Sequence, residues 1–231
     1  MKEKTNYPSV DKTHLQGISN FKLHPFIPNM SVYNSIKLIN IPYMNNIAID
    51  CLDLSLNYKE LIKNSNVIAK SLIELGVKPG QIITVCMPNY AQAVEIFLAA
   101  NKIGVTVSFI NSFAKKEETI KYLNYFESPV FVNYNKDEDY NREIKGKTKV
   151  RNIITLDKND LNRKDFNKIN GNLIGYNDLV TFSDLGLVSD FQRGCFKTNF
   201  NGNQDALILF TSGTTGEPKS VLITNKNILA S

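Results

Sequence analysis

The feature that most constrains the fold is an alternation of helix-like and strand-like segments between residues 57 and 134. The segment 57–76, NYKELIKNSNVIAKSLIELG, has apolar residues three or four positions apart. Asn57 and Glu60 are spaced as a capping box, and Gly76 is placed as a stop signal. This pattern predicts an amphipathic helix.

The next segments continue the alternation. IITVCM (82–87) is a β-branched apolar run, typical of a strand that is covered on both faces. Helical patterns at 91–104 and 115–128 then alternate with strand patterns at 105–110 and 129–134. Strands and helices that alternate at these lengths pair in parallel with right-handed crossovers. The sequence therefore predicts an α/β fold of mostly parallel βαβ units.

Shorter elements precede this region. Residues 1–30 form a polar lead-in, and SVYNSIKLI (31–39) predicts a short amphipathic helix. NIAIDCL (46–52) and SLNY (55–58) predict two strands around a turn centred on Asp53.

We divide the remainder of the chain into three parts. Residues 31–134 form a βα subdomain, and residues 135–203 form a variable, loop-rich region with many Asn and Lys residues. In that region, VRNIITL (150–156) predicts a strand and YNDLVTFSDLG (176–186) a helix. Residues 204–231 then give a strand, a polar loop, a second strand and the start of a helix.

Composition and charge exclude several functional classes. The chain is 42% hydrophobic and 21% charged, as in globular proteins. Its net charge is +5, but the densest basic cluster, 142–151, has no interleaved aromatics, which favours a solvated surface over a nucleic-acid partner. No apolar run is long enough for a transmembrane segment, and 1–17 lacks the apolar centre of a signal peptide. We therefore predict a cytoplasmic protein.

Potential metal ligands and nucleophiles are few. The three cysteines, Cys51, Cys86 and Cys195, lie far apart without a C-x-x-C pair, so reduced and inert thiols are expected. The two histidines, His14 and His24, both lie near the N-terminus. We assign no catalytic residue and no metal ligand to this chain.

The segment FTSGTTGEPKS (210–220) is the one stretch whose composition indicates a ligand. Gly213 and Gly216 permit sharp turns at which backbone N–H groups converge on an anion. Hydroxyl donors and one cation complete the set: Thr211, Ser212, Thr214, Thr215 and Lys219. This combination suits a polyphosphate. The alternative is an ordinary hairpin turn, although such a turn needs only one or two special residues.

A P-loop is the nearest phosphate-binding motif, and the sequence departs from it. Residues 213–220 fit G-x-x-x-x-G-K-[ST] except at Pro218, which stands where the glycine should be. Proline removes one N–H donor, and a strand pattern follows Lys219 where a P-loop has a helix. A nucleoside triphosphatase with an altered P-loop is therefore disfavoured.

The segment FTSGTTGEPKSVLITNKN closely resembles the signature of the adenylate-forming superfamily, which comprises acyl-CoA synthetases, luciferases and the adenylation domains of peptide synthetases. Three other segments resemble family elements more weakly: LNYKEL, GVKPGQIITVCMPN and AANKIGVTVSFIN. FINSFAKKEETIKYL is more similar to the acyl-CoA ligases than to the peptide synthetases.

The resemblance implies the N-terminal domain of an enzyme with a two-step reaction. A carboxylic acid reacts with Mg²⁺-ATP to give an acyl-adenylate and pyrophosphate, and a thiol, which we expect to be CoA, then accepts the acyl group. The loop from Thr211 to Lys219 would hold the β- and γ-phosphates. Replacing Lys219 with Ala is expected to slow adenylation about 10²-fold.

Two positions depart from the family pattern. Ser220 replaces a glycine after the lysine. Asn225 stands where the family usually has a histidine that often lines the acyl pocket, so the resemblance implies a substrate-binding role there. The alternative is that Asn225 caps the last helix.

The family's adenine-binding residues and its catalytic lysine would follow residue 231. We therefore expect the 231-residue chain to be an incomplete domain that does not adenylate an acid by itself. The alternatives are a non-catalytic nucleotide-binding module or a half-enzyme that needs a partner chain to supply the missing C-terminal portion.

Overall fold

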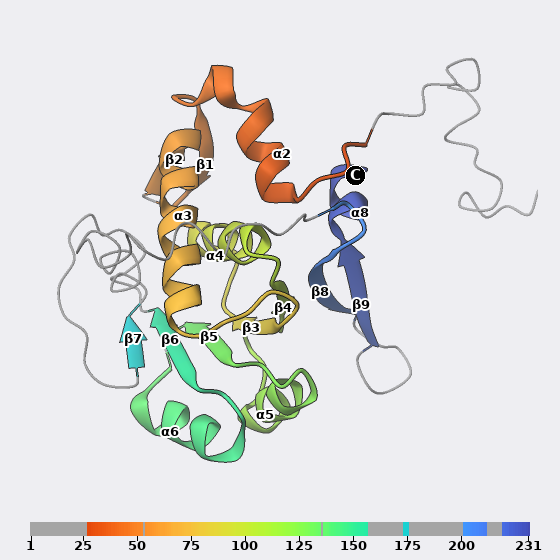
Figure 1. Cartoon of the computed structure of the whole chain (residues 1–231). Coiled ribbons are helices and arrows are strands. Elements are labelled where there is room, and N and C mark those ends of the chain that lie inside the picture. The colour runs from red at the N-terminus through yellow and green to blue at the C-terminus, as the bar shows by residue number, and fades with distance from the viewer. Residues whose placement is uncertain (1–26, 53, 135, 157–172, 176–200, 212–218) are drawn as a thin grey trace, which may run out of the picture.

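The computed structural model describes residues 27–52, 54–134, 136–156, 173–175, 201–211 and 219–231 (Figure 1). In chain order, its elements are α2 (Val32–Ile39), the 3₁₀ turn η2 (Ile41–Tyr43), β1 (Ile47–Cys51), β2 (Leu54–Asn57), α3 (Tyr58–Glu74), β3 (Ile82–Cys86), α4 (Ala91–Lys102), β4 (Thr106–Phe109), α5 (Lys116–Tyr125), β5 (Val130–Tyr134), α6 (Glu138–Lys147), β6 (Asn152–Leu156), β7 (Leu173–Gly175), β8 (Asp205–Thr211), β9 (Lys219–Thr224) and α8 (Asn225–Leu229).

The described strands form one large sheet and one small one. The large sheet has seven strands in the order β7-β6-β5-β3-β4-β8-β9, and every pair in it is parallel except β8–β9. β1 and β2 form a separate antiparallel pair. The α/β fold with mostly parallel strands is therefore confirmed, and the chain adds an antiparallel hairpin at one edge.

Helices cover both faces of the large sheet, with α3 and α4 on one side and α5 and α6 on the other (Figure 1). On the first side Ile68 and Leu72 of α3 and Ile96 of α4 pack against strand residues such as Val85 and Val107. On the second side Leu123 and Ile144 pack against Phe131 and Ile153. Each of these fully buried side chains stabilises the fold by roughly 1.5–3 kcal/mol.

The helix predicted from 57–76 is α3, and its ends follow the predicted signals. The Asn57 side chain accepts from the Glu60 N–H at 2.9 Å, and the Glu60 carboxylate accepts from the Asn57 N–H at 2.9 Å. These two bonds form the predicted capping box. Gly76 follows the helix with a φ of +78°, a conformation that favours glycine, so the chain turns there.

The region 135–203 holds more regular structure than expected, because it includes α6. Asp137 caps this helix by accepting from the Tyr140 N–H at 2.7 Å, and Ile144 is buried. Acidic residues in its first turn and Lys145 and Lys147 in its last turn complement the helix dipole. The sequence did not predict this helix, because its residues are mostly polar and because Gly146 is unfavourable within a helix. The helix predicted at 176–186 lies outside the described residues.

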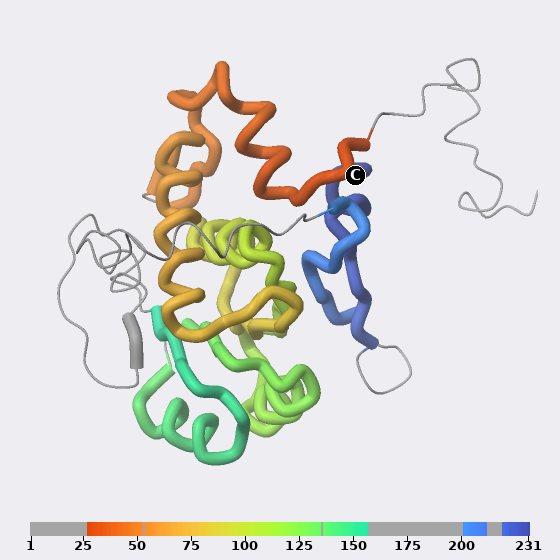
Figure 2. The backbone as a smooth tube through the Cα atoms, viewed as in Figure 1, coloured from red at the N-terminus to blue at the C-terminus, as the bar shows by residue number. Residues whose placement is uncertain are grey.

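Figure 2 follows the backbone and shows α2 beginning beside α8, near the C-terminus. The bond that joins them is made by Asn225 of α8, whose side-chain oxygen accepts from the Val32 N–H at 3.1 Å. The first and last described helices are therefore fixed to one another.

Candidate functional site

The predicted phosphate loop joins the two strands of the β8–β9 hairpin. Phe210 pairs with Ser220 and Thr211 with Lys219, and the Thr211 hydroxyl donates to the Lys219 carbonyl at 3.3 Å. Both Thr211 and Lys219 are exposed. The structure thus brings these two predicted site residues together. The others, Ser212, Gly213, Thr214, Thr215 and Gly216, lie outside the described residues.

Lys219 is the first residue of β9. In a P-loop the lysine opens a helix whose N-terminus faces the phosphates. A strand at this position agrees with the argument from Pro218 against a P-loop.

The hairpin lies at the same edge of the sheet as two other loops. Since β3, β4 and β8 are parallel, their carboxyl ends meet at one edge. Ser108 pairs with Ile208, so Asn111 and Thr211 each lie three residues beyond a paired position. Residues 87–90, which follow β3, and 110–112, which follow β4, accordingly share this edge with the ends of the predicted phosphate loop.

This edge contains the switch point of the sheet. The chain leaves β3 through α4 and enters β4, the neighbour of β3 on one side. It leaves β4 through α5 and enters β5, the neighbour of β3 on the other side. α4 and α5 lie on opposite faces of the sheet (Figure 1). Open α/β sheets bind their ligands in the crevice that forms where successive helices part in this way.

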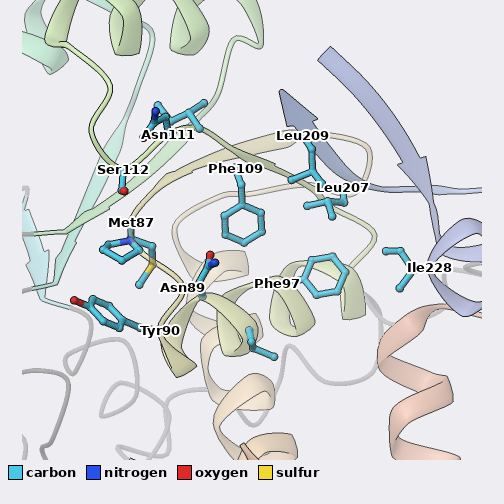
Figure 3. Close-up of a pocket in the computed structure, with 14 residues that line it drawn as sticks. Met87, Asn89, Tyr90, Phe97, Phe109, Asn111, Ser112, Leu207, Leu209 and Ile228 are labelled. Carbon is cyan, nitrogen blue, oxygen red and sulfur yellow. The ribbon is translucent and has the colours of Figure 1, made fainter. Parts of the chain in front are cut away.

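A cavity of about 730 Å³ opens beside this switch point, on the side of β3 where β4 and β8 lie (Figure 3). Loop residues Asn89, Asn111 and Ser112 line its polar part. Apolar side chains line the remainder, and they come from the loops, α4, β4, β8 and α8: Met87, Pro88, Tyr90, Ala93, Val94, Phe97, Phe109, Ile110, Leu207, Leu209 and Ile228. The volume and the mixture of apolar walls with a few polar groups are typical of small-molecule sites.

Hydrogen bonds of Ile110 and Asn111 fix the polar end of the cavity. The Asn111 side-chain oxygen accepts from the Phe113 N–H at 2.9 Å, and the Asn111 carbonyl accepts from the Cys86 thiol at 3.4 Å. The Ile110 N–H donates to the Val85 carbonyl at 2.9 Å, which extends the β3–β4 pairing into the loop. Asn111 is therefore fixed at the strand end while its side chain stays exposed.

The apolar walls were not identified from the sequence. Phe97 and Phe109 lie in regular elements and have the pattern of core residues. In Figure 3 their rings lie between the loop residues and Leu207, Leu209 and Ile228. Polar residues that directly follow predicted strands, such as Asn89 and Asn111, were the signal that could have indicated this site.

Asn225 lies apart from the residues that line the cavity. Its side chain is buried, and its oxygen accepts from the Val32 N–H and from the Asn101 amide at 2.7 Å. Its amide donates to the carbonyls of Asn201 and Gln204 at 3.3 and 3.2 Å. The alternative role as helix cap was wrong, because Thr224 caps α8 and Asn225 follows it as the first helical residue. The substrate-binding role stays a prediction, and the observed contacts are structural.

The described cysteines differ in exposure. Burial raises the pKa of the Cys86 thiol to about 11, so it is protonated at neutral pH, while Cys51 is half-buried. Cys195 lies outside the described residues. Among the described residues, no three His, Cys, Asp or Glu side chains are grouped as a metal site would require.

None of the helices in the described part of the chain has both the length and the apolar character needed to cross a membrane.

Comparison with known proteins identifies the family of the chain. Residues 42–231 match the AMP-binding enzyme family. The chain is 30% identical over 179 residues to luciferin 4-monooxygenase of Photuris pensylvanica, covering 75% of this chain and 30% of the luciferase. It is 26% identical over 164 residues to 4-coumarate–CoA ligase 3 of Arabidopsis thaliana, covering 71% of this chain and 26% of the ligase.

Solved structures share the fold. The crystal structure of the anthranilate CoA ligase AuaEII in complex with anthranoyl-AMP superimposes with a TM-score of 0.68 at 18% identity, covering 90% of this chain and 36% of that one. The structure is thus that of the N-terminal domain of adenylate-forming enzymes. The chain belongs to the AMP-binding enzyme family, and it spans about a third or less of the two curated relatives' length.

Proposed function

We propose that this chain is the N-terminal part of an ATP-dependent ligase that activates a carboxylic acid as an acyl-adenylate and transfers it to a thiol, CoA. The observation that carries the proposal is the position of the β8–β9 hairpin. Thr211 and Lys219 pair at the carboxyl edge of the sheet, and Thr211 follows Leu209, a lining residue of the switch-point cavity, by two positions on β8. Phosphates bound at the hairpin would therefore lie next to a pocket that can hold an acid.

The residues at this edge fit the phosphates of ATP. Lys219 supplies a positive charge and Thr211 a hydroxyl, both exposed and held side by side by strand pairing. Mg²⁺-ATP supplies the electrophilic α-phosphate and the pyrophosphate leaving group. The role of this chain is to hold the β- and γ-phosphates and to stabilise the negative charge that develops on the leaving group. In the complete enzyme, Lys219→Ala should slow adenylation about 10²-fold.

Pyrophosphate binding by the 231-residue chain tests the phosphate site directly. Lys219→Ala should weaken binding of Mg²⁺-pyrophosphate in a calorimetric or NMR titration by about tenfold, because it removes a charge-assisted contact. Lys226→Ala is the matched control, since Lys226 is also exposed and lies seven positions further along the chain, on α8. Equal losses in both variants would indicate a general charge effect and contradict the proposed site.

The chain alone should show no acid-dependent exchange of pyrophosphate into ATP, because a phosphate loop without an adenine pocket binds nucleotide weakly. Detectable exchange by the purified chain would contradict this expectation. A half-enzyme that pairs with a second chain stays an alternative, supported by the exposed apolar residues Leu209, Val221 and Leu222 on the hairpin. A cytoplasmic location stays a prediction from the sequence.

A further inference from the structure

We propose that the chain binds the surface of anionic membranes through an apolar tip, formed by the end of α2 and the turn that follows it. This interaction goes beyond the ligase function proposed above, and neither proposal depends on the other. The evidence is the exposure of the tip, its position, the charges beside it and the hydrogen bonds of its backbone. The apolar tip consists of Leu38, Ile39, Ile41, Tyr43 and Ile47.

The side chains of the apolar tip are exposed to an unusual degree. Five of the twelve exposed large apolar side chains of the described residues lie within this ten-residue stretch. Exposed apolar side chains that are gathered in one place indicate an interaction site, whereas single ones are normal. The exposed fractions are 52% for Leu38, 65% for Ile39, 59% for Ile41, 54% for Tyr43 and 66% for Ile47.

The apolar tip lies at one extremity of the molecule. Figures 1 and 2 show the turn after α2 at the top of the view, on the opposite side from α6. The other end of α2 is packed inside the fold, where Val32 and Tyr33 are buried in a cluster with Leu61 and Leu98. A projecting apolar tip on a packed base fits a lipid surface that it can penetrate.

The charges beside the apolar tip complement anionic headgroups. Residues 30–49 include Lys37 and no Asp or Glu. The Lys59 N–H donates to the Met44 carbonyl at 3.0 Å, so the start of α3 lies against the turn. Lys37, Lys59 and Lys63, one turn further along α3, are all exposed. Lysines beside an anionic lipid surface are attracted to it, and the same lysines would repel a second copy of this chain, whose net charge is +5.

Two acidic residues lie on the same elements. Glu60 is occupied at the start of α3, where its carboxylate accepts from the Asn57 N–H at 2.9 Å. Asp50 lies three residues beyond Ile47 on β1. The three lysines outnumber these two acids, so the charge around the apolar tip is positive.

The backbone of the apolar tip is suited to enter a headgroup layer. The Asn40 N–H donates to the Ile36 carbonyl at 3.3 Å. The Tyr43 N–H donates to the Asn40 carbonyl and the Asn46 N–H to the Tyr43 carbonyl, both at 2.9 Å. Pro42 has no N–H to satisfy. Backbone groups that already have partners cost less to remove from water, so insertion does not expose unpaired donors to lipid.

A tryptophan reporter tests the insertion directly, because the chain has no tryptophan of its own. The emission of Tyr43→Trp should shift to shorter wavelength when vesicles of phosphatidylcholine with about a third phosphatidylserine are added, because the indole enters the interface. Tyr125→Trp is the control, since Tyr125 is 73% exposed at the end of α5, and its emission should not change. No shift for Tyr43→Trp, or equal shifts for both variants, would overturn the proposal.

Two leucines of nearly equal exposure provide matched variants. Leu38 is 52% exposed on α2, and Leu222 is 53% exposed on β9. Leu38→Asp should weaken binding in a vesicle cosedimentation assay by about tenfold, because it replaces an apolar anchor with a negative charge. Leu222→Asp should change binding by less than about twofold if the apolar tip is the contact. Equal losses would overturn the assignment of the tip.

Lipid charge and self-association separate a membrane from other occupants of the apolar tip. Lys37→Gln should weaken binding to the phosphatidylserine vesicles about fivefold and leave binding to pure phosphatidylcholine unchanged. Equal losses on both lipids would contradict the electrostatic part of the proposal. If Leu38→Asp reduces self-association in sedimentation velocity while the unsubstituted chain binds no vesicles, the tip is an interface between copies, and the proposal is overturned. Lost vesicle binding with unchanged self-association is the expected result.

Discussion

Asn225 shows how much one buried amide can connect. It joins α8 to the start of α2 through Val32, to α4 through Asn101, and to the segment before β8 through Gln204. Asn101 in turn accepts from the Tyr33 N–H at 2.9 Å. Two asparagines therefore hold the first and last helices of the described chain on α4.

Loss of this amide should be costly. Asn225→Ala leaves the Val32 N–H and the Gln204 carbonyl without this partner in a buried setting, and we expect the free energy of unfolding to fall by about 2–4 kcal/mol. Urea denaturation measures the loss. Asn227→Ala is the control, because Asn227 is exposed on the same helix and its side-chain hydrogen bonds to other described residues are those of the cap with Thr224, worth about 1 kcal/mol. Equal losses would contradict the central role of Asn225.

Among single residues, those with local roles were predictable and those with distant partners were not. Asn57 and Glu60 act within three positions of one another, so their capping box could be recognised from spacing. Asn225 has partners in three separate segments, and its sequence neighbourhood indicated none of them. The fixed position of Asn111 likewise depends on β3 and β4 being neighbours.

At the scale of elements, α5 and α6 are tied together by an ion-pair network on the second face of the sheet. Glu143 of α6 contacts Lys116 of α5 and, at 2.7 Å, Lys147 one turn further along α6. The hydrogen bonds from these two lysines hold the pKa of the Glu143 carboxyl at about 2. The ionised form of Glu143 is therefore more stable in the folded chain than in the unfolded one.

The sign of the pH dependence follows from this lowered pKa. The stabilisation by Glu143 is fully present above its ordinary pKa, about 4.3, and is lost as the pH falls toward about 2. Glu143→Gln should lower the melting temperature at pH 7 and reduce the acid-induced loss between pH 4.5 and pH 2. The same replacement at Glu138, which is exposed on α6, is the control. An unchanged acid profile for Glu143→Gln would contradict the network's role.

The elements themselves were largely predictable because their signals are local. The periodicity and caps of α3 and the apolar runs of β3 and β5 correspond to the observed segments. α6 was missed, since Tyr140 and Ile144 give it only a narrow apolar stripe. The antiparallel return of β9 on β8 could not be distinguished from a parallel arrangement by its apolar pattern alone.

At the scale of the whole molecule, the edge of the large sheet at β9 carries exposed apolar side chains. β9 ends the described sheet, and no other described strand pairs with its outer edge. Leu209 is 40% exposed and Leu222 53% exposed on this hairpin. An apolar edge strand of this kind is a site where another strand or another copy of the chain can add.

We therefore expect the isolated chain to self-associate as its concentration rises. Leu222→Lys should reduce this association, because a lysine on an edge strand opposes pairing, and sedimentation velocity would measure the change. Ile41→Lys is the control, since Ile41 is 59% exposed on η2, away from the hairpin. If both variants reduce association equally, the edge of β9 is not responsible.

The sequence by itself determined the class of fold and the chemistry of one loop, because helix periods, strand runs, caps and the glycine and threonine content of the loop all lie within short segments. Only the tertiary structure decided where that loop stands. It placed the ends of the loop beside residues 87–90 and 110–112, which lie about a hundred positions earlier, and formed a cavity between them. It also joined Val32 to Asn225 across 193 positions. Contacts of that separation depend on the order of strands and the faces that helices cover, and no local pattern encodes either.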